Sequence, residues 1–258
     1  MTYTHKNFVP HIEIAAEKLI SILGFPITNT LVTSWVVVGV LILFATLISR
    51  RLAIVPGGVQ NIFEFFTESF LDLMEGMFGS RENAERYFPV VATIFLFVII
   101  SNWLGILPGV GSIGFFEHMI GEDGIIGMRF VPLFCSAASD LNVTLALGIV
   151  AVLLVNIAGA QAIGVRHHLG KYFTLKNPID TFVGLLEFIS EFAKIVSFSF
   201  RLFGNVFAGE VLLVIVGLLV PYGAPIPFLL LEIFVGFIQA LVFAMLTMVF
   251  ISIAVAHH

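Results

Sequence analysis

One long apolar stretch of this sequence, residues 179–256, holds the charged side chains whose types could do chemistry. Arg201 stands in SFSFRLFGNVFAGE, residues 197–210, between flanks that are almost entirely apolar. A charge at membrane depth costs about 2.5–3.5 kcal/mol on insertion scales, so residues of this kind usually serve a function. Further charged residues of the stretch are Glu187, Glu191, Lys194, Glu210 and Glu232.

The spacing of the polar residues sorts them onto two faces of a helix. Steps of three or four residues, which keep side chains on one face, separate Glu187, Ser190, Lys194, Ser197, Arg201 and Asn205. Gly204 and Ala208 extend this face, and such small residues let another helix approach closely. Glu210 is nine residues beyond Arg201 and therefore points to the opposite side at 100° per residue. We expect no ion pair between them within the helix.

Three interpretations of Arg201 follow from the residues. It could form an ion pair with a carboxylate of its own chain, extend to the membrane surface, or meet a charge that moves. Extension to the surface is disfavoured, because about ten apolar residues follow before the PYGAPIP turn at 221–227. The other two interpretations stay open. A guanidinium keeps its charge in either case.

The composition predicts an all-α integral membrane protein. Of its 258 residues 59% are hydrophobic and 11% are charged, whereas a soluble domain has about 25% charged residues. The mean hydropathy is +1.08. The net charge of −5 gives no basic footprint for nucleic acid. The single cysteine, Cys135, excludes an intrachain disulfide and a Cys-based metal site, and we expect no cofactor.

The apolar runs predict a single membrane domain over 1–258, with five spans and one amphipathic surface helix. The acidic side chains of the amphipathic helix recur every three or four positions and so share one face. We expect this face either to meet another protein or to be exposed to solvent. The other segments are predicted as a mixed surface segment at 1–27, a loop at 108–139 with room for a short helix, and a basic loop at 165–177. The predicted spans are 29–49, 87–107, 140–164, 179–220 and 228–256, and the amphipathic helix is 59–78.

The helix over 179–220 is longer than a membrane is thick. At ~1.5 Å per residue it would measure about 63 Å, against a hydrocarbon core of ~30 Å. It must therefore tilt steeply, or break near Gly204 or Gly209. With the last helix it predicts a long, steeply tilted hairpin. Seven Lys and Arg residues flank the spans on one side and three on the other, which places the N-terminus outside and the C-terminus in the cytoplasm.

Several motifs, in order along most of the chain, resemble subunit a of the bacterial-type rotary F-type ATP synthase. They are PGGVQNIFEFF, ISNWLGILPG (100–109), SAASDLNVTLALG (136–148), EFISEFAKIVSFSFRLFGNVFAGE and FIQALVFAMLTMVFISIA (237–254). The resemblance implies a non-catalytic stator subunit of a bacterial plasma (inner) membrane, moving H⁺ or, where the ring selects it, Na⁺. Its implied partners are the c-ring, a ring of small subunits that each carry a membrane carboxylate, peripheral-stalk b subunits and membrane lipid. No phosphate-binding GxxxxGK[ST] loop is present.

The resemblance also implies roles for single residues. Arg201 matches the arginine that faces the ring, and Gln239 matches a glutamine near that arginine. Residues that match an outer proton route are Asn205, Glu210 and Asp140. Residues that match the lining of an inner route are Glu187, Ser190 and Lys194. Glu232 stands where some relatives have a histidine, two turns from Gln239, so this sequence offers a pair of carboxyls with Glu210.

Other interpretations remain for these residues. A secondary transporter could use Arg201 to bind an anionic substrate, although the sequence shows no internal repeat, and a scaffold could hold internal ion pairs. Asp140 could simply cap a helix, and Glu191 could only satisfy neighbouring helices. Asn102 and its neighbour Trp103 are typical of an interfacial anchor. His167 and His168 are expected to be loop residues on the cytoplasmic face.

Overall fold

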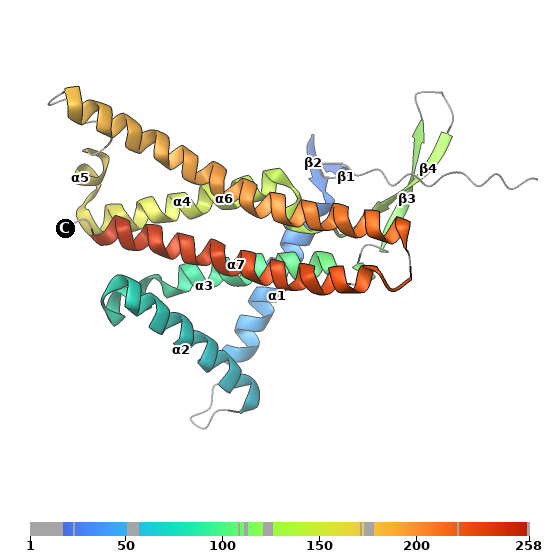
Figure 1. Ribbon diagram of the computed structural model, residues 1–258, viewed down its shortest axis with the longest axis horizontal. Helices are drawn as coiled ribbons and strands as arrows, with labels where there is room; N and C mark the ends of the chain where they lie inside the picture. The colour runs from blue at the N-terminus through green and yellow to red at the C-terminus, as the bar shows by residue number, and fades with distance from the viewer. Residues whose placement is uncertain are drawn as a thin grey trace, which may run out of the picture.

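The protein is a bundle of long helices with two small β-hairpins. A computed structural model describes residues 18–22, 24–50, 57–107, 109–110, 113–120, 126–170, 172, 178–220 and 222–256. Long helices α3, α4, α6 and α7 pack lengthwise against one another, and α1 and α2 lie obliquely to them (Figure 1). The helices are α1 (Asn29–Ser49), α2 (Gly58–Phe78), α3 (Arg81–Ile106), α4 (Leu141–Ile163), α5 (Val165–Gly170), α6 (Pro178–Leu219) and α7 (Pro225–Ala256).

Five of these helices, α1, α3, α4, α6 and α7, are long and apolar enough to cross a membrane. The predicted class, an all-α membrane protein of about five spans, is confirmed. Helix α3 begins earlier than expected because Ser80 caps it, accepting a hydrogen bond from the Asn83 amide at 3.4 Å. Helix α6 runs through Gly204 and Gly209 without a break. Its 42 residues therefore measure about 63 Å, too long to stand upright in a hydrocarbon core.

Two segments predicted as irregular contain strands. In the first, β1 (Lys18–Ile22) pairs antiparallel with β2 (Phe25–Thr28). In the second, β3 (Gly114–Ile120) pairs antiparallel with β4 (Ile126–Pro132). The loop prediction for 108–139 was wrong for these strands, because their short runs are interrupted by Gly and lack clear alternation. The short helix allowed there is present as the 3₁₀ turn η2 (Ala137–Ser139).

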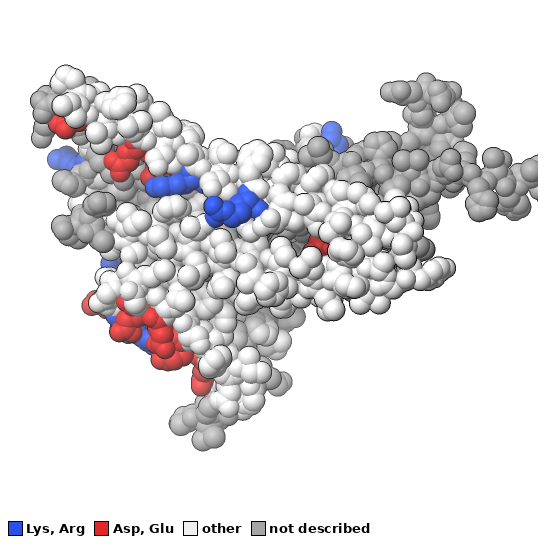
Figure 2. All heavy atoms as spheres, in the orientation of Figure 1, with Lys and Arg blue, Asp and Glu red and all other residues white. Residues whose placement is uncertain are grey.

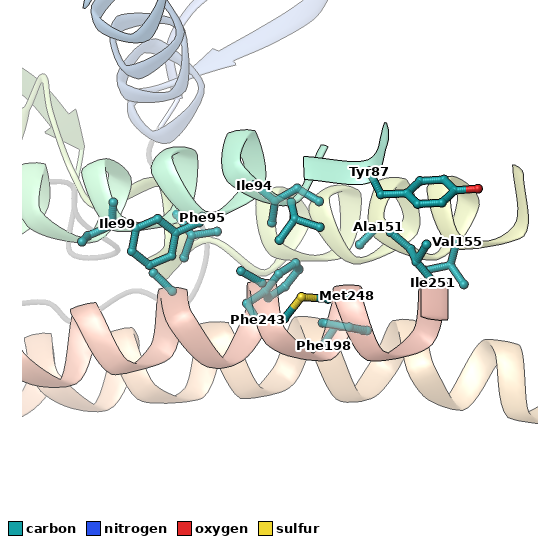
Figure 3. Close-up of a cluster of buried hydrophobic side chains, with 14 of the residues drawn as sticks. Tyr87, Ile94, Phe95, Ile99, Ala151, Val155, Phe198, Phe243, Met248 and Ile251 are labelled. Atoms are coloured by element: carbon teal, nitrogen blue, oxygen red, sulfur yellow. The ribbon is translucent and has the colours of Figure 1, made fainter. Parts of the chain in front are cut away.

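The bundle buries polar side chains and exposes apolar ones. A central core joins Phe198 of α6, Phe243 and Met248 of α7 and Phe95 of α3 (Figure 3). The rings of Phe198 and Phe243 have centroids 4.6 Å apart. Large apolar side chains such as Phe200, 54% exposed, cover much of the outside. Figure 2 shows this face as mostly uncharged. Lipid as solvent produces this pattern, because polar groups must then be satisfied internally.

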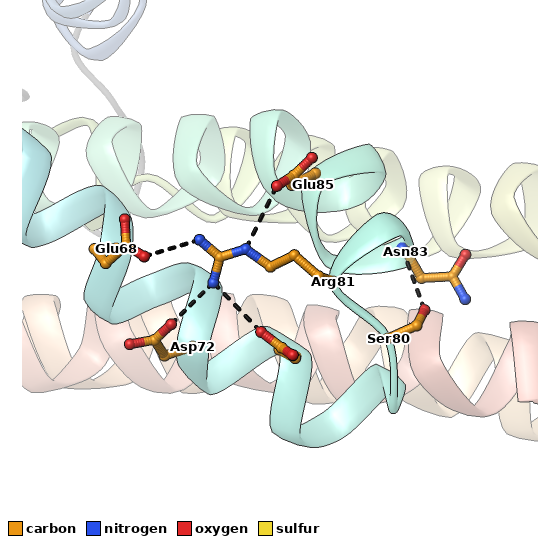
Figure 4. Close-up of polar contacts among 7 residues, drawn as sticks. Glu68, Asp72, Ser80, Arg81, Asn83 and Glu85 are labelled. Carbon is orange, nitrogen blue, oxygen red and sulfur yellow. Dashed lines mark hydrogen bonds and ion pairs between the residues drawn. The ribbon is translucent and has the colours of Figure 1, made fainter.

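The acidic face of α2 is partly neutralised within the chain. Arg81, the first residue of α3, contacts Asp72 at 2.9 Å, Glu68 at 3.0 Å and Glu75 at 3.4 Å, all on α2. It also contacts Glu85 one turn later on α3 (Figure 4). This network links α2 to the start of α3, alongside the packing of Phe66 and Phe70 on Phe95. A protein partner for the remaining α2 surface stays a prediction.

Close helix packing at Gly148 gives a test of the bundle. A Cβ on Gly148 of α4 would lie 2.5 Å from Ser199 Oγ and 3.1 Å from the Ile195 carbonyl oxygen on α6. We expect Gly148→Leu to lower stability by about 1–3 kcal/mol through overpacking. The matched control is Gly39→Leu on α1, where a Cβ meets nothing within 4 Å. Thermal unfolding of both variants in detergent measures the difference, and equal losses would contradict this packing.

Candidate functional site

Arg201 lies on the exposed side of α6, among exposed apolar side chains. Its Nη2 donates a hydrogen bond to Ser197 Oγ, one turn earlier, at a long 3.4 Å. Within the described part of the chain, no carboxylate lies within ion-pair distance of it. The hypothesis of an ion pair inside the chain is therefore wrong for these residues. Figure 2 shows two basic patches over α6; acidic atoms lie beside the one nearer the N-terminal end of α6, and the other is surrounded by uncharged atoms.

The face of α6 that the spacing identified is open. Ser190, Ser197, Asn205 and Ala208 are all exposed. A Cβ added at Gly204 would meet nothing within 4 Å. The face around Arg201 is thus unpacked and, beyond Arg201, lined by small residues, so a second helix could approach its backbone closely.

Asn205 and Gln239 join α6 to α7 one turn beyond Arg201. Asn205 Nδ2 donates to Gln239 Oε1 at 2.6 Å. Gln239 is only 4% exposed, and its Nε2 finds no hydrogen-bond partner among the described residues. A buried amide nitrogen without a partner is costly, so this nitrogen can donate to water or to an arriving group. The structure thus brings together the two amides that sequence analysis placed near Arg201.

Glu232 and Glu210 meet where α6, α7 and η2 converge. Glu232 is buried and lies directly on α6, since a Cβ at Gly209 would be 2.5 Å from its Oε1. Glu210 is close to Ser139 of η2 and to the backbone of Ser136 just before it, and near enough to Glu232 for the two charges to interact. The two carboxyls expected to form a pair are therefore neighbours. Only a residue as small as glycine at position 209 allows this contact.

Helix α3 adds buried polar groups that sequence analysis misread. Asn102 is 1% exposed and donates through Nδ2 to the carbonyl oxygen of Gly236 at 3.1 Å. Gly236 lies on α7 between Glu232 and Gln239. In the described residues, Asn102 Oδ1, Ser101 Oγ and Glu232 Oε2 have no hydrogen-bond partner. The interpretation of Asn102 as an interfacial anchor was wrong, because it faces this polar row and not a membrane surface.

Asp140 is the N-cap of α4. Its Oδ1 accepts from the Asn142 amide at 2.8 Å, and its Oδ2 accepts from Thr30 Oγ1 on α1 at 2.8 Å. The interpretation of Asp140 as a helix cap is confirmed, and the contact to Thr30 explains why the carboxylate is buried. Its membership of an outer route stays a prediction.

The inner candidates gather at the other end of α6. Lys194 Nζ pairs with Glu191 Oε1 at 2.8 Å and lies 5.0 Å from the centre of the Phe250 ring. Ser190 is exposed and Glu187 is half-buried. Lys194 was expected to line the inner route with Glu187 and Ser190. The structure pairs it with Glu191, for which a role in satisfying neighbouring helices had been left open.

Two further residues near Glu191 were missed. Asn156 of α4 donates through Nδ2 to Glu191 Oε2 at 3.1 Å, and His168 of α5 contacts Asn156 Oδ1 at 3.0 Å. His168 lies within helix α5 and is 5% exposed, so its prediction as a loop residue was wrong. Periodicity cannot detect a contact between separate helices. In the part of the chain that the structure describes, no group of three or more His, Cys, Asp or Glu could hold a metal ion.

Comparison with known proteins adds a family to this geometry. Residues 31–252 match the ATP synthase A chain family. The chain is 32% identical over 233 residues to ATP synthase subunit a of Moorella thermoacetica, covering 90% of this chain and 93% of that protein. It is 34% identical over 230 residues to ATP synthase subunit a of Gloeobacter violaceus, covering 89% and 85%. The subunit a of Campylobacter jejuni strain 81-176 is 33% identical over 215 residues, covering 82% and 83%.

The contact between Asn205 and Gln239 can be tested by a double-mutant cycle. Asn205→Leu removes the hydrogen bond that Gln239 Oε1 accepts. The buried amide of Gln239 then lacks this partner. We expect a coupling energy of about 0.6–1.7 kcal/mol between Asn205→Leu and Gln239→Leu, the range of hydrogen bonds in membrane proteins. Thermal unfolding in detergent of the two single variants and the double variant measures it. Additive effects would mean that the bond does not stabilise the hairpin.

Proposed function

We propose how this chain works from its membership of the ATP synthase A chain family, which makes it a stator subunit of the membrane sector of ATP synthase. In this proposal it presents Arg201 to the carboxylates of a c-ring, between two offset proton half-channels. The observation that carries this proposal is an arginine on an exposed apolar face with no carboxylate of the described chain beside it. A permanent charge in such a place is costly, and a partner charge from another subunit would offset that cost. The chain itself would perform no ATP chemistry.

The electrostatics of Arg201 explain how it would act on the ring. A guanidinium does not lose its proton in a protein. Two opposite unit charges ~4 Å apart attract by about 4 kcal/mol at an effective dielectric of 20. A protonated ring carboxyl that reaches Arg201 would therefore release its proton to an adjacent aqueous route. The anion would pass Arg201 and take up a proton from the other route.

The outer half-channel would be formed by the polar row between α3, α6 and α7. Glu210 and Glu232 are near enough for their charges to interact, and a water molecule between them would let a proton pass from one to the other. Buried polar atoms without partners, as on Asn102 and Gln239, offer hydrogen bonds to water molecules. Asn205 connects this row to the exposed face of Arg201. Asp140, which lies at the start of α4, would belong to the outer rim.

The inner half-channel would follow the opposite end of α6. Glu187, Ser190 and Lys194 lie there on or near the face of Arg201, two to four turns before it along the helix. Arg201 would then stand between the two routes and repel protons that could pass directly from one to the other. Each charge that crosses ~100 mV releases ~2.3 kcal/mol, which ring rotation would deliver to ATP synthesis.

The proposal also places the chain in its surroundings. The open face of α6 would meet the c-ring, and the peripheral-stalk b subunits would contact surfaces away from it, such as that of α2. The multi-pass chain would lie in a bacterial plasma membrane with its N-terminus outside and its C-terminus in the cytoplasm, as the Lys and Arg counts favour. The transported ion would be H⁺, or Na⁺ if the ring binds that ion.

Arg201 variants test the proposed function most directly. We expect Arg201→Ala and Arg201→Lys both to reduce proton-driven ATP synthesis to background, because a lysine is a point charge that can lose its proton. ATP synthesis by complexes reconstituted in liposomes, with assembly checked by copurification, is the measurement. Ser197→Ala, which removes only the long 3.4 Å contact, should keep most of the activity. Normal synthesis by the lysine variant would refute the separator role.

The outer route is tested by neutralising its two carboxyls. We expect Glu210→Gln combined with Glu232→Gln to slow ATP synthesis by about 10²-fold, since positioned proton donors and acceptors contribute that much. Passive proton conduction by the membrane sector should fall in parallel, while assembly stays intact. The exposed α2 variant Glu64→Gln is the control for lost acidic charge. Unchanged proton conduction in the double variant would remove these residues from the route.

A further inference from the structure

Helix α5 fills the angle where α6 separates from the bundle. Figure 1 shows the N-terminal part of α6 leaving α4, with α5 between them. Polar side chains from all three helices meet in this angle. They are Glu191 and Lys194 of α6, Asn156 of α4 and His168 of α5, joined by Tyr172 just beyond α5. We call them the α5 cluster.

Asn156 organises the α5 cluster. Its Nδ2 donates to the carbonyl oxygen of Val152 at 2.9 Å and to Glu191 Oε2 at 3.1 Å. Its Oδ1 accepts from the Tyr172 hydroxyl at 3.0 Å and lies 3.0 Å from His168 Nε2. Because Oδ1 can only accept, the Nε2 of His168 must carry a hydrogen. Both ends of the amide are thus in use, and its orientation is set.

The groups behind Asn156 are held in place. The His168 ring lies against Gly159 of α4, where an added Cβ would be 2.9 Å from its Cε1. Burial raises the pKa of Tyr172 above its usual range, and the nearby carboxylates of Glu191 and Glu187 raise it further. Tyr172 therefore remains a hydrogen-bond donor at all physiological pH values. Neither group needs to change its charge for Asn156 to keep its position.

Glu191 differs from the rest of the α5 cluster because it is the cluster's one carboxylate and contacts both Lys194 and Asn156. Its side chain is 14% exposed, and that of its partner Lys194 is 24% exposed. Glu187 lies one turn before it, so the two carboxyls share one side of α6. Tyr172 feels the charge of both. Along α6, Glu187 comes first, then Glu191 and Lys194, and Lys194 is two turns before Arg201.

We infer that Glu191 is a proton-carrying group of the inner route, and that Asn156 positions its carboxylate beside Lys194. This inference rests on the proposed function. The carboxylate takes up a proton released at the ring and gives it to water on the side of Glu187, so it returns to its starting state. The titratable groups that face it are Lys194 and Glu187 on α6, His168 on α5, and Tyr172. In the competing interpretation, Glu191 only fastens α6 to α4 and α5.

Two substitutions at Glu191 separate these interpretations, because one keeps the shape and the other keeps the chemistry. Glu191→Gln preserves the length of the side chain but cannot carry a proton. Glu191→Asp is shorter and fits the contacts less well, but it still titrates. We expect the Gln variant to lose about tenfold or more in ATP synthesis by reconstituted complexes, and the Asp variant to retain most of it. A fastening role predicts the reverse order, and that order in assembled complexes would overturn the inference.

The positioning role of Asn156 has its own readout. Asn156→Asp places a second carboxylate 3.1 Å from the site now occupied by Glu191 Oε2. Two adjacent carboxylates hold a shared proton more tightly, so the dependence of ATP synthesis on inner pH should move up by roughly one unit. Asn61→Asp, on the exposed surface of α2, controls for the added charge and should not move it. An unshifted profile in the Asn156 variant would overturn the inference.

These experiments also distinguish this inference from the proposed function. If Arg201→Ala abolishes ATP synthesis while Glu191→Gln equals or exceeds Glu191→Asp, the inference fails and the proposed function stands. If Arg201→Ala retains synthesis, the proposed function fails together with everything that rests on it. Assembly is measured by copurification of the complex. Should Glu191→Gln not assemble, the pH profile of Asn156→Asp decides, because a purely structural contact would not shift it.

Discussion

The cost of a permanent charge on an apolar surface is the constraint on which the other features of this protein depend. Arg201 cannot lose its proton, and in the described chain no carboxylate neutralises it. The proposed partner charge from another subunit would offset this cost. The open face of Ser197, Gly204 and Asn205 supplies the space for that partner, and the rest of the bundle holds this face in place.

The bundle holds this face through close contacts on the other side of α6. Gly148 of α4 meets Ser199, and Gly209 of α6 receives the carboxyl of Glu232. Both contacts need a residue without a side chain, so α6 is fixed at two points on opposite sides of Arg201 along its length. An unbroken helix of 42 residues would otherwise bend or shift in the membrane. These contacts on the buried face hold α6 in the bundle, so its exposed face is left without packing inside the chain.

The sequence predicted the features that follow from the periodicity of a single helix. It missed the contacts that form between two helices. The spans, the polar face around Arg201 and the separate direction of Glu210 all follow from a period of 3.6 residues. The burial of His168 and Asn102 does not, because each contacts a different helix, at Asn156 and Gly236. The hairpin of β3 and β4 was missed because its pairing is set by backbone contacts between segments. The pairing of Glu210 with Glu232 was found from resemblance, and the packing at Gly209 supplies its physical reason.

Between its two polar ends, α6 presents mainly apolar side chains to the bundle. The buried exception is Ser199, whose hydroxyl donates to the Ile195 carbonyl oxygen of α6 itself. Phe198, Leu202 and Val206 are buried there against α4 and α7. From position 195 to position 209 the chain has a single charged residue, Arg201, and it points away from this core. Water that reaches the α5 cluster from one side, or Glu232 from the other, therefore meets a dry core inside the bundle. In the proposed mechanism, a proton would pass from one end to the other along the exposed face, carried past Arg201 by a carboxyl of the c-ring.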